Sequence, residues 1–211
     1  MDKILLGKDD LDRLLKWRDD HKELVRKCPA PLSAVEIILS HNGFLIKGFR
    51  NGQQLKLHLN HNGKSLGSTV FELTPKGTWL AIPGKEKMKT DREGVQSVLT
   101  VYCSLMALMT YCKPTVTNGE AKRSNSARKP VASPRSGNSR ITYVLRTVSG
   151  KPWIGPTGSH ASPRGEFNVR GHYRHYKNGK VVWINEYRKG TGDRTKKTYK
   201  IGGKLSEKHE E

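Results

Sequence analysis

The Asn-Gly pairs at 42–43, 51–52, 62–63 and 178–179 constrain the fold of this 211-residue chain more than any other feature. Asn-Gly between alternating apolar and polar residues is the strongest short-range signal for a β-hairpin. The alternation around the first three pairs predicts an antiparallel meander that is apolar on one face. Its expected strands are Val35–Ser40, Phe44–Arg50, Leu55–Asn60, Thr69–Leu73 and Thr78–Ile82.

Two helices are expected to accompany the meander. Asp9 and Asp10 can cap a helix that runs to about Lys27, and Thr90 to Glu93 has the capping-box pattern of a helix that continues to about Cys112. The first helix has an apolar stripe of Leu11, Leu14, Leu15 and Trp17. The second has a wider apolar face of Val95, Val98, Leu99, Tyr102, Leu105, Met106 and Met109. The fold class is therefore predicted to be α+β, with helices packed on an N-terminal antiparallel β-meander.

Charge is unevenly distributed along the chain. Lys and Arg number 39 against 19 Asp and Glu, a formal net charge of +20, of which residues 1–112 carry +5 and residues 113–211 carry +15. Residues 113–140 hold seven basic residues and one acid with few apolar side chains, which predicts a disordered basic linker. This linker is either a soluble tether or an arm that lies along phosphates. Residues 1–112 then form a scaffold or recognition domain, and residues 141–205 a small basic β domain.

Composition excludes several classes of protein. No run approaches the roughly 18 apolar residues of a membrane span, and the acidic flanks of the N-terminal apolar patch do not fit a signal peptide. Three cysteines cannot form a closed disulfide framework, so we expect a cytoplasmic protein with no membrane partner. His58 and His61 are spaced so that their imidazoles point apart on a strand, and no metal or other cofactor is expected.

Residues 169–190 predict a single hairpin around Asn178-Gly179. A two-residue type I′ turn would place Arg174 opposite Trp183, and Tyr173 opposite Ile184. One face then collects a basic and aromatic set, which we expect to bind nucleic acid because arginines grip phosphates and aromatic rings stack on bases. The predicted binding residues are Arg170, Arg174, Tyr176, Trp183, Asn185 and Tyr187, together with Lys177, Lys180, Arg188 and Lys189. The alternative is a purely structural face whose side chains contact one another, with Arg174 in a cation–π contact with Trp183.

His172 is the candidate general base, because its expected position between two arginines favours the neutral imidazole. His160 is the candidate second proton carrier. Such a pair could cleave RNA without a metal by activating the 2′-hydroxyl. A His172 that only hydrogen-bonds Asn185 or a phosphate explains the same residues.

The segment from Val169 to Gly190, VRGHYRHYKNGKVVWINEYRKG, resembles a family of largely uncharacterised proteins encoded by phages and mobile elements of Gram-positive bacteria. Its Arg-Gly-His-aromatic-Arg core is also similar to the C-terminal region of type V anti-CRISPR proteins that suppress production of the Cas nuclease. The resemblance implies a regulatory or anti-defence role directed at RNA. It also implies a shared set of residues: Arg170, Gly171, His172, Arg174 and Trp183.

The leading hypothesis is a phage-type RNA-directed regulatory or anti-defence protein that binds nucleic acid, RNA rather than DNA, through the C-terminal hairpin. A second hypothesis is a metal-independent endoribonuclease that uses His172. A third is an inhibitor that docks on a host or CRISPR-associated protein through the N-terminal sheet.

Overall fold

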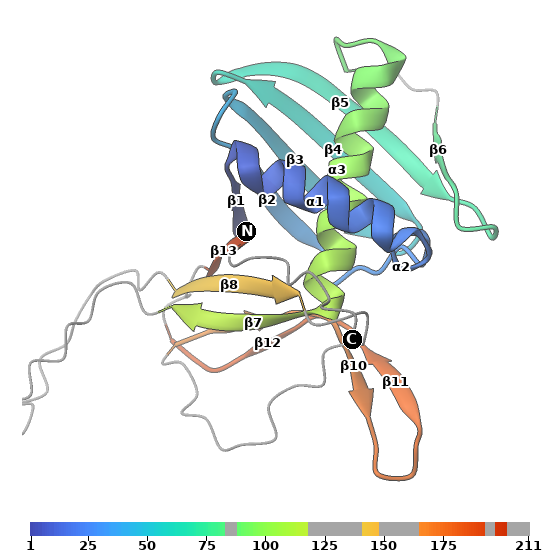
Figure 1. Cartoon of the computed structure of the whole chain (residues 1–211), viewed down its shortest axis with the longest axis vertical. Coiled ribbons are helices and arrows are strands. Elements are labelled where there is room, and N and C mark those ends of the chain that lie inside the picture. Colours follow the sequence, from blue (N-terminus) through green and yellow to red (C-terminus); the bar gives the residue numbers. More distant parts are fainter. Residues whose placement is uncertain (83–87, 118–140, 148–164, 193–196, 202–211) are drawn as a thin grey trace, which may run out of the picture.

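The computed structural model describes residues 1–82, 88–117, 141–147, 165–192 and 197–201. It has a mixed α/β fold in which a large, mostly antiparallel sheet carries helices on one face (Figure 1). The order of strands in this sheet is β6-β5-β4-β3-β2-β1-β13-β8-β7, and two further strand pairs, β10-β11 and β9-β12, lie outside it.

The expected meander forms one side of the sheet. Its strands are β2 (Ala34–Leu39), β3 (Phe44–Asn51), β4 (Gln54–His61), β5 (Lys64–Leu73) and β6 (Trp79–Ala81). Asn62 and Gly63 both adopt positive φ, 48° and 79°, as a type I′ turn between β4 and β5 requires. The apolar side of β4 is buried at Leu55, Leu57 and Leu59, which confirms the predicted one-sided alternation.

The other side of the sheet combines strands from both ends of the chain. β1 (Asp2–Leu6) lies parallel to β2 and also parallel to β13 (Lys197–Ile201), which pairs in turn with β8 (Ile141–Thr147). β8 pairs antiparallel with β7 (Cys112–Thr117). Strands from both sides of the boundary expected at residue 112 therefore belong to one sheet. The linker expected to begin at residue 113 begins with a strand instead, and residues 118–140 lie outside the described residues.

Two short helices stand where one was expected. α1 (Lys8–Asp20) begins with Asp10 accepting a hydrogen bond from the Gly7 amide at 2.9 Å, and α2 (Lys22–Arg26) follows it directly. The predicted continuous helix to Lys27 is wrong at His21, where φ is −131° and ψ is 38°. The His21 ring stacks on Trp17 with centroids 4.8 Å apart, and its Nδ1 lies 2.9 Å from the Trp17 carbonyl oxygen. This local contact replaces the helical hydrogen bond at the break.

The second of the two expected helices is α3 (Arg92–Tyr111), and it lies at the centre of the core. Asp91 Oδ1 accepts from the Gly94 amide at 2.7 Å, so the cap lies one residue after the expected Thr90. α3 contacts α1, α2 and β4, and its last turns reach β7 and β8 (Figure 1). Every residue of α3 from Ser104 to Tyr111 is buried. This part of the helix is therefore covered on all sides, and not only on the expected apolar face. This 20-residue helix is long and apolar enough to cross a bilayer, with a mean hydropathy of 1.3, but 72% of that stretch is buried within the fold.

Candidate nucleic-acid interface

The hairpin of β10 (His172–His175) and β11 (Val181–Ile184) has a different register from the expected one. Tyr173 lies opposite Trp183, and Arg174 lies opposite Val182. The Gly179 amide donates to the Tyr176 carbonyl at 3.0 Å, and the Tyr176 amide donates to the Lys180 carbonyl at 2.9 Å. These bonds pair Tyr176 with Lys180 and leave a loop of three residues between them, so the predicted register is wrong by one residue.

The turn type explains this shift. Only Gly179 of the turn adopts positive φ, 79°, whereas a type I′ turn would need it at Asn178 as well. A type I turn followed by a glycine in the left-handed region is the usual three-residue hairpin loop. Asn178 Oδ1 accepts from the Lys180 amide at 3.1 Å, which satisfies the asparagine without positive φ.

The shift moves Trp183 to the opposite face from Arg174. Trp183 now contacts Tyr173, with ring centroids 4.8 Å apart and planes at 68°. The Arg174 guanidinium lies over the Tyr176 ring, 5.9 Å from its centroid, and not over Trp183. The predicted cation–π contact between Arg174 and Trp183 is therefore not formed, and that alternative is wrong.

Arg170 does not lie on an exposed face. Its side chain is 7% exposed, and its Nη1 donates to the carbonyl of Met109 in the last turn of α3. Carbonyls in the last turn of a helix have no partner within the helix, and a cation there also interacts favourably with the helix dipole. Arg170 thus joins the C-terminal strands to α3 and is not available to bind phosphate in this conformation.

His172 is half-buried, and its Nδ1 lies 3.1 Å from the Arg170 carbonyl oxygen. Because a carbonyl oxygen only accepts, this contact places the proton of the neutral ring on Nδ1 and leaves Nε2 as the acceptor. His160 lies outside the described residues, so the expected histidine pair is not placed.

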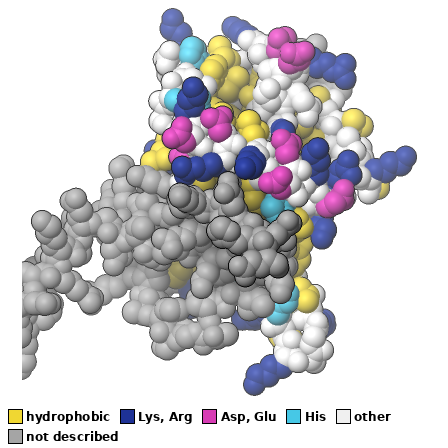
Figure 2. Space-filling view, in the orientation of Figure 1, with side chains coloured by type: hydrophobic (Ala, Val, Ile, Leu, Met, Phe, Trp, Pro, Cys, Tyr) yellow, Lys and Arg dark blue, Asp and Glu magenta, His cyan; other side chains and the backbone are white. Residues whose placement is uncertain are grey.

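The remaining predicted cations are exposed on and beside the hairpin. The hairpin projects from the body of the molecule, and basic side chains lie along it (Figures 1 and 2). No Asp or Glu occurs in the sequence from His172 to Asn185. The exposed members of the predicted set are Arg174, Tyr176, Lys177, Lys180, Asn185, Tyr187, Arg188 and Lys189; we call Arg174, Tyr176, Lys177 and Lys180 the hairpin tip.

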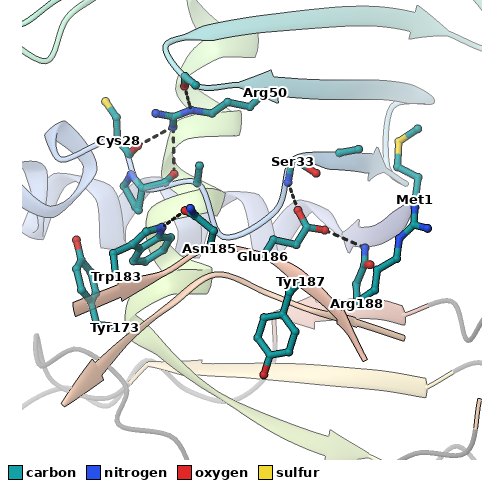
Figure 3. Close-up of a pocket in the computed structure, with 15 residues that line it drawn as sticks. Met1, Cys28, Ser33, Arg50, Tyr173, Trp183, Asn185, Glu186, Tyr187 and Arg188 are labelled. Atoms are coloured by element: carbon teal, nitrogen blue, oxygen red, sulfur yellow. Dashed lines mark hydrogen bonds between the residues drawn. The ribbon is translucent and has the colours of Figure 1, made fainter. Parts of the chain in front are cut away.

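A groove of about 900 Å³ lies at the base of the hairpin (Figure 3). Its walls are the segment from Cys28 to Ala34, the end of β3 at Arg50, and the C-terminal strands. The structure brings four of the predicted binding residues to this groove: Trp183, Asn185, Tyr187 and Arg188.

Trp183 and Asn185 hold each other in place in the groove. Trp183 Nε1 donates to Asn185 Oδ1 at 2.9 Å. Gly171 allows the tryptophan ring to approach the backbone, since a Cβ there would lie 2.7 Å from Trp183 Cζ2. The Gly171 amide donates to the Pro31 carbonyl at 2.7 Å, so the same glycine ties the strand to the N-terminal segment.

Sequence reasoning missed the residues that dock the C-terminal strands. Glu186 accepts from the Ser33 amide at 2.5 Å, which joins it to the N-terminal segment, and from Asn168 Nδ2 at 2.8 Å. On the N-terminal side of the groove, Arg50 Nη1 donates to the Cys28 carbonyl at 2.6 Å. Glu186 is the only acid between Phe167 and Gly192, a signal that could have marked it as a docking residue.

Buried charges lie near this junction. Asp2 is 4% exposed and Lys197 is 7% exposed, and Lys197 Nζ donates to the Asn168 carbonyl. Burial raises the pKa of Asp2, an effect that the nearby Lys197 opposes. Burial likewise lowers the pKa of Lys197, and Asp2 opposes that shift. Lys197 is therefore part of this buried junction and not of an exposed basic surface.

The described residues contain no group of three His, Cys, Asp or Glu side chains placed to hold a metal ion. Comparison of the chain with known protein families, with curated proteins and with solved structures finds no match.

Proposed function

We propose that the protein binds nucleic acid, RNA in preference to DNA, through the hairpin tip and the neighbouring β12 (Tyr187–Lys189). The observation that carries this proposal is a projecting hairpin whose cations are exposed and which contains no carboxylate. Lysine and arginine side chains in such a setting attract phosphates over a range set by ionic strength.

Two features of the hairpin tip favour a nucleic acid over a simple anion. Tyr176 is 44% exposed beside Arg174, so a planar ring and a guanidinium are offered together. Base–aromatic stacking contributes about 1–3 kcal/mol per base and tolerates any sequence. Preference for RNA rests on the resemblance of residues 169–190 alone.

The biological setting that we propose is a regulator of phage type in the bacterial cytoplasm, directed at a host defence system. The Val169–Gly190 motif supports this setting. Loss of defence suppression in cells when Lys177 and Lys180 are both replaced by alanine would connect RNA binding with that role.

The salt dependence of binding tests the proposal directly. Affinity for a single-stranded RNA of about 12 nucleotides is measured by fluorescence anisotropy between 50 and 300 mM KCl, as a rough working range for counterion release. We expect a steep fall, and we expect Lys177→Ala/Lys180→Ala to weaken binding at every salt concentration and to reduce the salt slope by about 1–2.

The matched control is Lys64→Ala/Lys76→Ala. Lys64 follows Asn62-Gly63 just as Lys180 follows Asn178-Gly179, and Lys76 is exposed in another turn. The control removes the same charge from the opposite part of the chain and should leave the slope unchanged. Equal effects of the two double variants would show that only net charge matters, and the proposed site would be wrong.

One observation favours the endoribonuclease as a second candidate. The Nδ1 contact of His172 leaves Nε2 as the ring atom able to accept a proton from a 2′-hydroxyl. His172→Gln should then abolish cleavage of RNA while its binding persists, and a 2′-deoxy substrate should bind without being cut. Cleavage that survives the substitution would rule out His172 as the base.

A further inference from the structure

The groove lies at one end of the hairpin and the hairpin tip at the other. β11 leads from Lys180 at the tip to Asn185 in the groove, five residues that extend about 17 Å at about 3.3 Å per residue. The groove volume, about 900 Å³, lies within the range of roughly 300–1,000 Å³ that small ligands occupy in proteins. The cavity is therefore close enough for a nucleic acid bound at the tip to reach it, on the hairpin face opposite Arg174.

One aromatic side chain of this groove, Trp183, is held in place before any ligand arrives. Trp183 is fixed by its edge contact with Tyr173 and by the close approach to Gly171. Tyr187 is 45% exposed at the rim and points away from the segment that contains Ser33 (Figure 3). A fixed ring loses little side-chain entropy when a planar ligand stacks against it.

Asn185 offers donors in a defined direction. Because the indole N–H can only donate, the atom that it contacts must be the amide oxygen, and the Nδ2 group is left with two hydrogens to offer. Asn185 is exposed, so these hydrogens can reach a ligand. The carbonyl and ring-nitrogen acceptors of an unpaired base match such a donor.

Arg188 is the exposed cation at the groove. Arg188 has 67% of its side chain exposed, and its Nε lies 3.5 Å from Glu166 Oε1. Glu186, the acid of the groove lining, has both carboxylate oxygens already accepting hydrogen bonds, from Ser33 and from Asn168. A phosphate at Arg188 would have to share this cation with Glu166, whereas the Glu186 carboxylate is already occupied.

We propose that this groove binds one unpaired nucleotide of the nucleic acid that the hairpin tip holds, with the base against Trp183 and Tyr187 and an acceptor of the base on Asn185 Nδ2. This inference rests on the proposed function and adds a substrate class to it. The ligand class is a nucleic acid with a bulged or looped-out base, preferred over a continuous duplex.

The experiment compares three RNA hairpins that share one stem: fully paired, with a single bulged uridine, and with an abasic residue at the bulge. We expect the wild-type protein to bind the bulged RNA about 5- to 150-fold more tightly than the other two, the fold-change that stacking of one base provides. Quenching of tryptophan fluorescence should accompany this binding, and Trp183→Phe should remove the quenching.

Two exposed residues provide variants that should leave the fold intact. Tyr187→Ala removes a stacking ring, and Asn185→Asp keeps the oxygen that Trp183 needs but removes the donor. Both should lower the ratio of bulged to paired affinity toward one. The ratio is the readout because the added charge of Asn185→Asp weakens both complexes.

The outcomes separate this inference from the proposed function. Wild-type protein that binds paired, bulged and abasic RNA equally would overturn the groove inference and leave the hairpin tip as the binding site. Lys177→Ala/Lys180→Ala should weaken all three complexes by the same factor. A protein that binds none of the three RNAs would overturn both proposals.

Discussion

Two arginines four residues apart have different roles, although the sequence presents them alike. Arg170 is buried against the carboxyl end of α3, whereas Arg174 is exposed beside Tyr176. We expect Arg170→Ala to lower the free energy of unfolding by about 2–4 kcal/mol, because it leaves a buried carbonyl without its charged donor.

The matched variant is Arg174→Ala. Loss of the exposed Arg174 side chain should change the free energy of unfolding by no more than about 0.5 kcal/mol, and it should weaken RNA binding. Urea denaturation and anisotropy on both variants separate the roles. An Arg170→Ala protein of unchanged stability would contradict the assignment of this side chain to the docking of the C-terminal strands.

Gly171 is needed for space and not for its backbone freedom. Its φ is not positive, but a Cβ would lie 2.7 Å from Trp183 Cζ2 and 3.2 Å from the Ala30 carbonyl oxygen. We expect Gly171→Ala to lower the free energy of unfolding by about 1–3 kcal/mol through overpacking.

A double-mutant cycle with Trp183→Phe tests this explanation. Phenylalanine lacks the outer ring atoms of indole, so Gly171→Ala should cost less in the Trp183→Phe background than in the wild type. Additive effects in thermal or urea denaturation would show that the ring is not the obstacle. The contact with the Ala30 carbonyl remains in both backgrounds and sets the residual cost.

At the scale of elements, the contact between α3 and β10 depends on protonated tyrosine. Tyr111 and Tyr173 stack with centroids 6.4 Å apart. Burial, with a smaller effect of Tyr173, raises the pKa of Tyr111 from 10.0 to about 12. The folded state therefore holds this proton to higher pH than the unfolded state does, so the stabilisation is complete below pH 10 and is lost as the pH rises through about 12.

Tyr111→Phe removes this titration. The difference in unfolding free energy between wild type and variant should fall as the pH rises from 9 to 12, a window that brackets the two pKa values. Tyr187→Phe, which alters an exposed ring, serves as the control and should show no such trend. A difference that stays constant with pH would place the Tyr111 hydroxyl in contact with solvent.

Elements with purely local determinants were predictable from the sequence. The meander followed from Asn-Gly pairs and alternation, and the hairpin expected at Asn62-Gly63 forms with a type I′ turn. The same dipeptide at Asn178-Gly179 forms a three-residue loop, because Asn178 keeps negative φ and bonds the Lys180 amide. A dipeptide alone does not distinguish these two loops, and one residue of difference moved Trp183 to the other face.

Elements with distant determinants were not predictable. β1 contains five residues with no hairpin signal, and its partners β2 and β13 lie about 30 and 195 positions away. Of the candidate site, the exposed lysines and Asn185 followed from the sequence, whereas the burial of Arg170 depends on the end of α3. The groove depends on contacts such as Glu186 with Ser33, which join segments 153 residues apart.

At the scale of the whole molecule, the sheet makes the two ends of the chain depend on each other. A chain that ends at residue 112 keeps the meander but leaves the β13-facing edge of β1 unpaired from Asp2 to Leu6. Unpaired edges of a sheet pair with other chains. We expect this truncated protein to self-associate more than the full chain does, as measured by size-exclusion chromatography with light scattering at several concentrations.

A truncated protein whose mass and stability match those expected of an independent folded unit would contradict this expectation and would support a domain boundary at residue 112. Addition of a peptide that spans Lys197–Ile201 offers a second test. It should reduce self-association if the missing strand is what exposes the edge of β1.

The parallel pairing of β1 with β13 also sets the order in which the molecule can assemble during synthesis. β2 is complete at Leu39, but β13 ends at Ile201, about 160 residues later, which a ribosome takes roughly 10–30 s to add. Throughout that interval a nascent chain holds β1 with one neighbour and one open edge. The middle of the sheet is thus the last part to close, and the time spent on the ribosome, rather than the stability of the finished protein, sets how long this edge is open to aggregation.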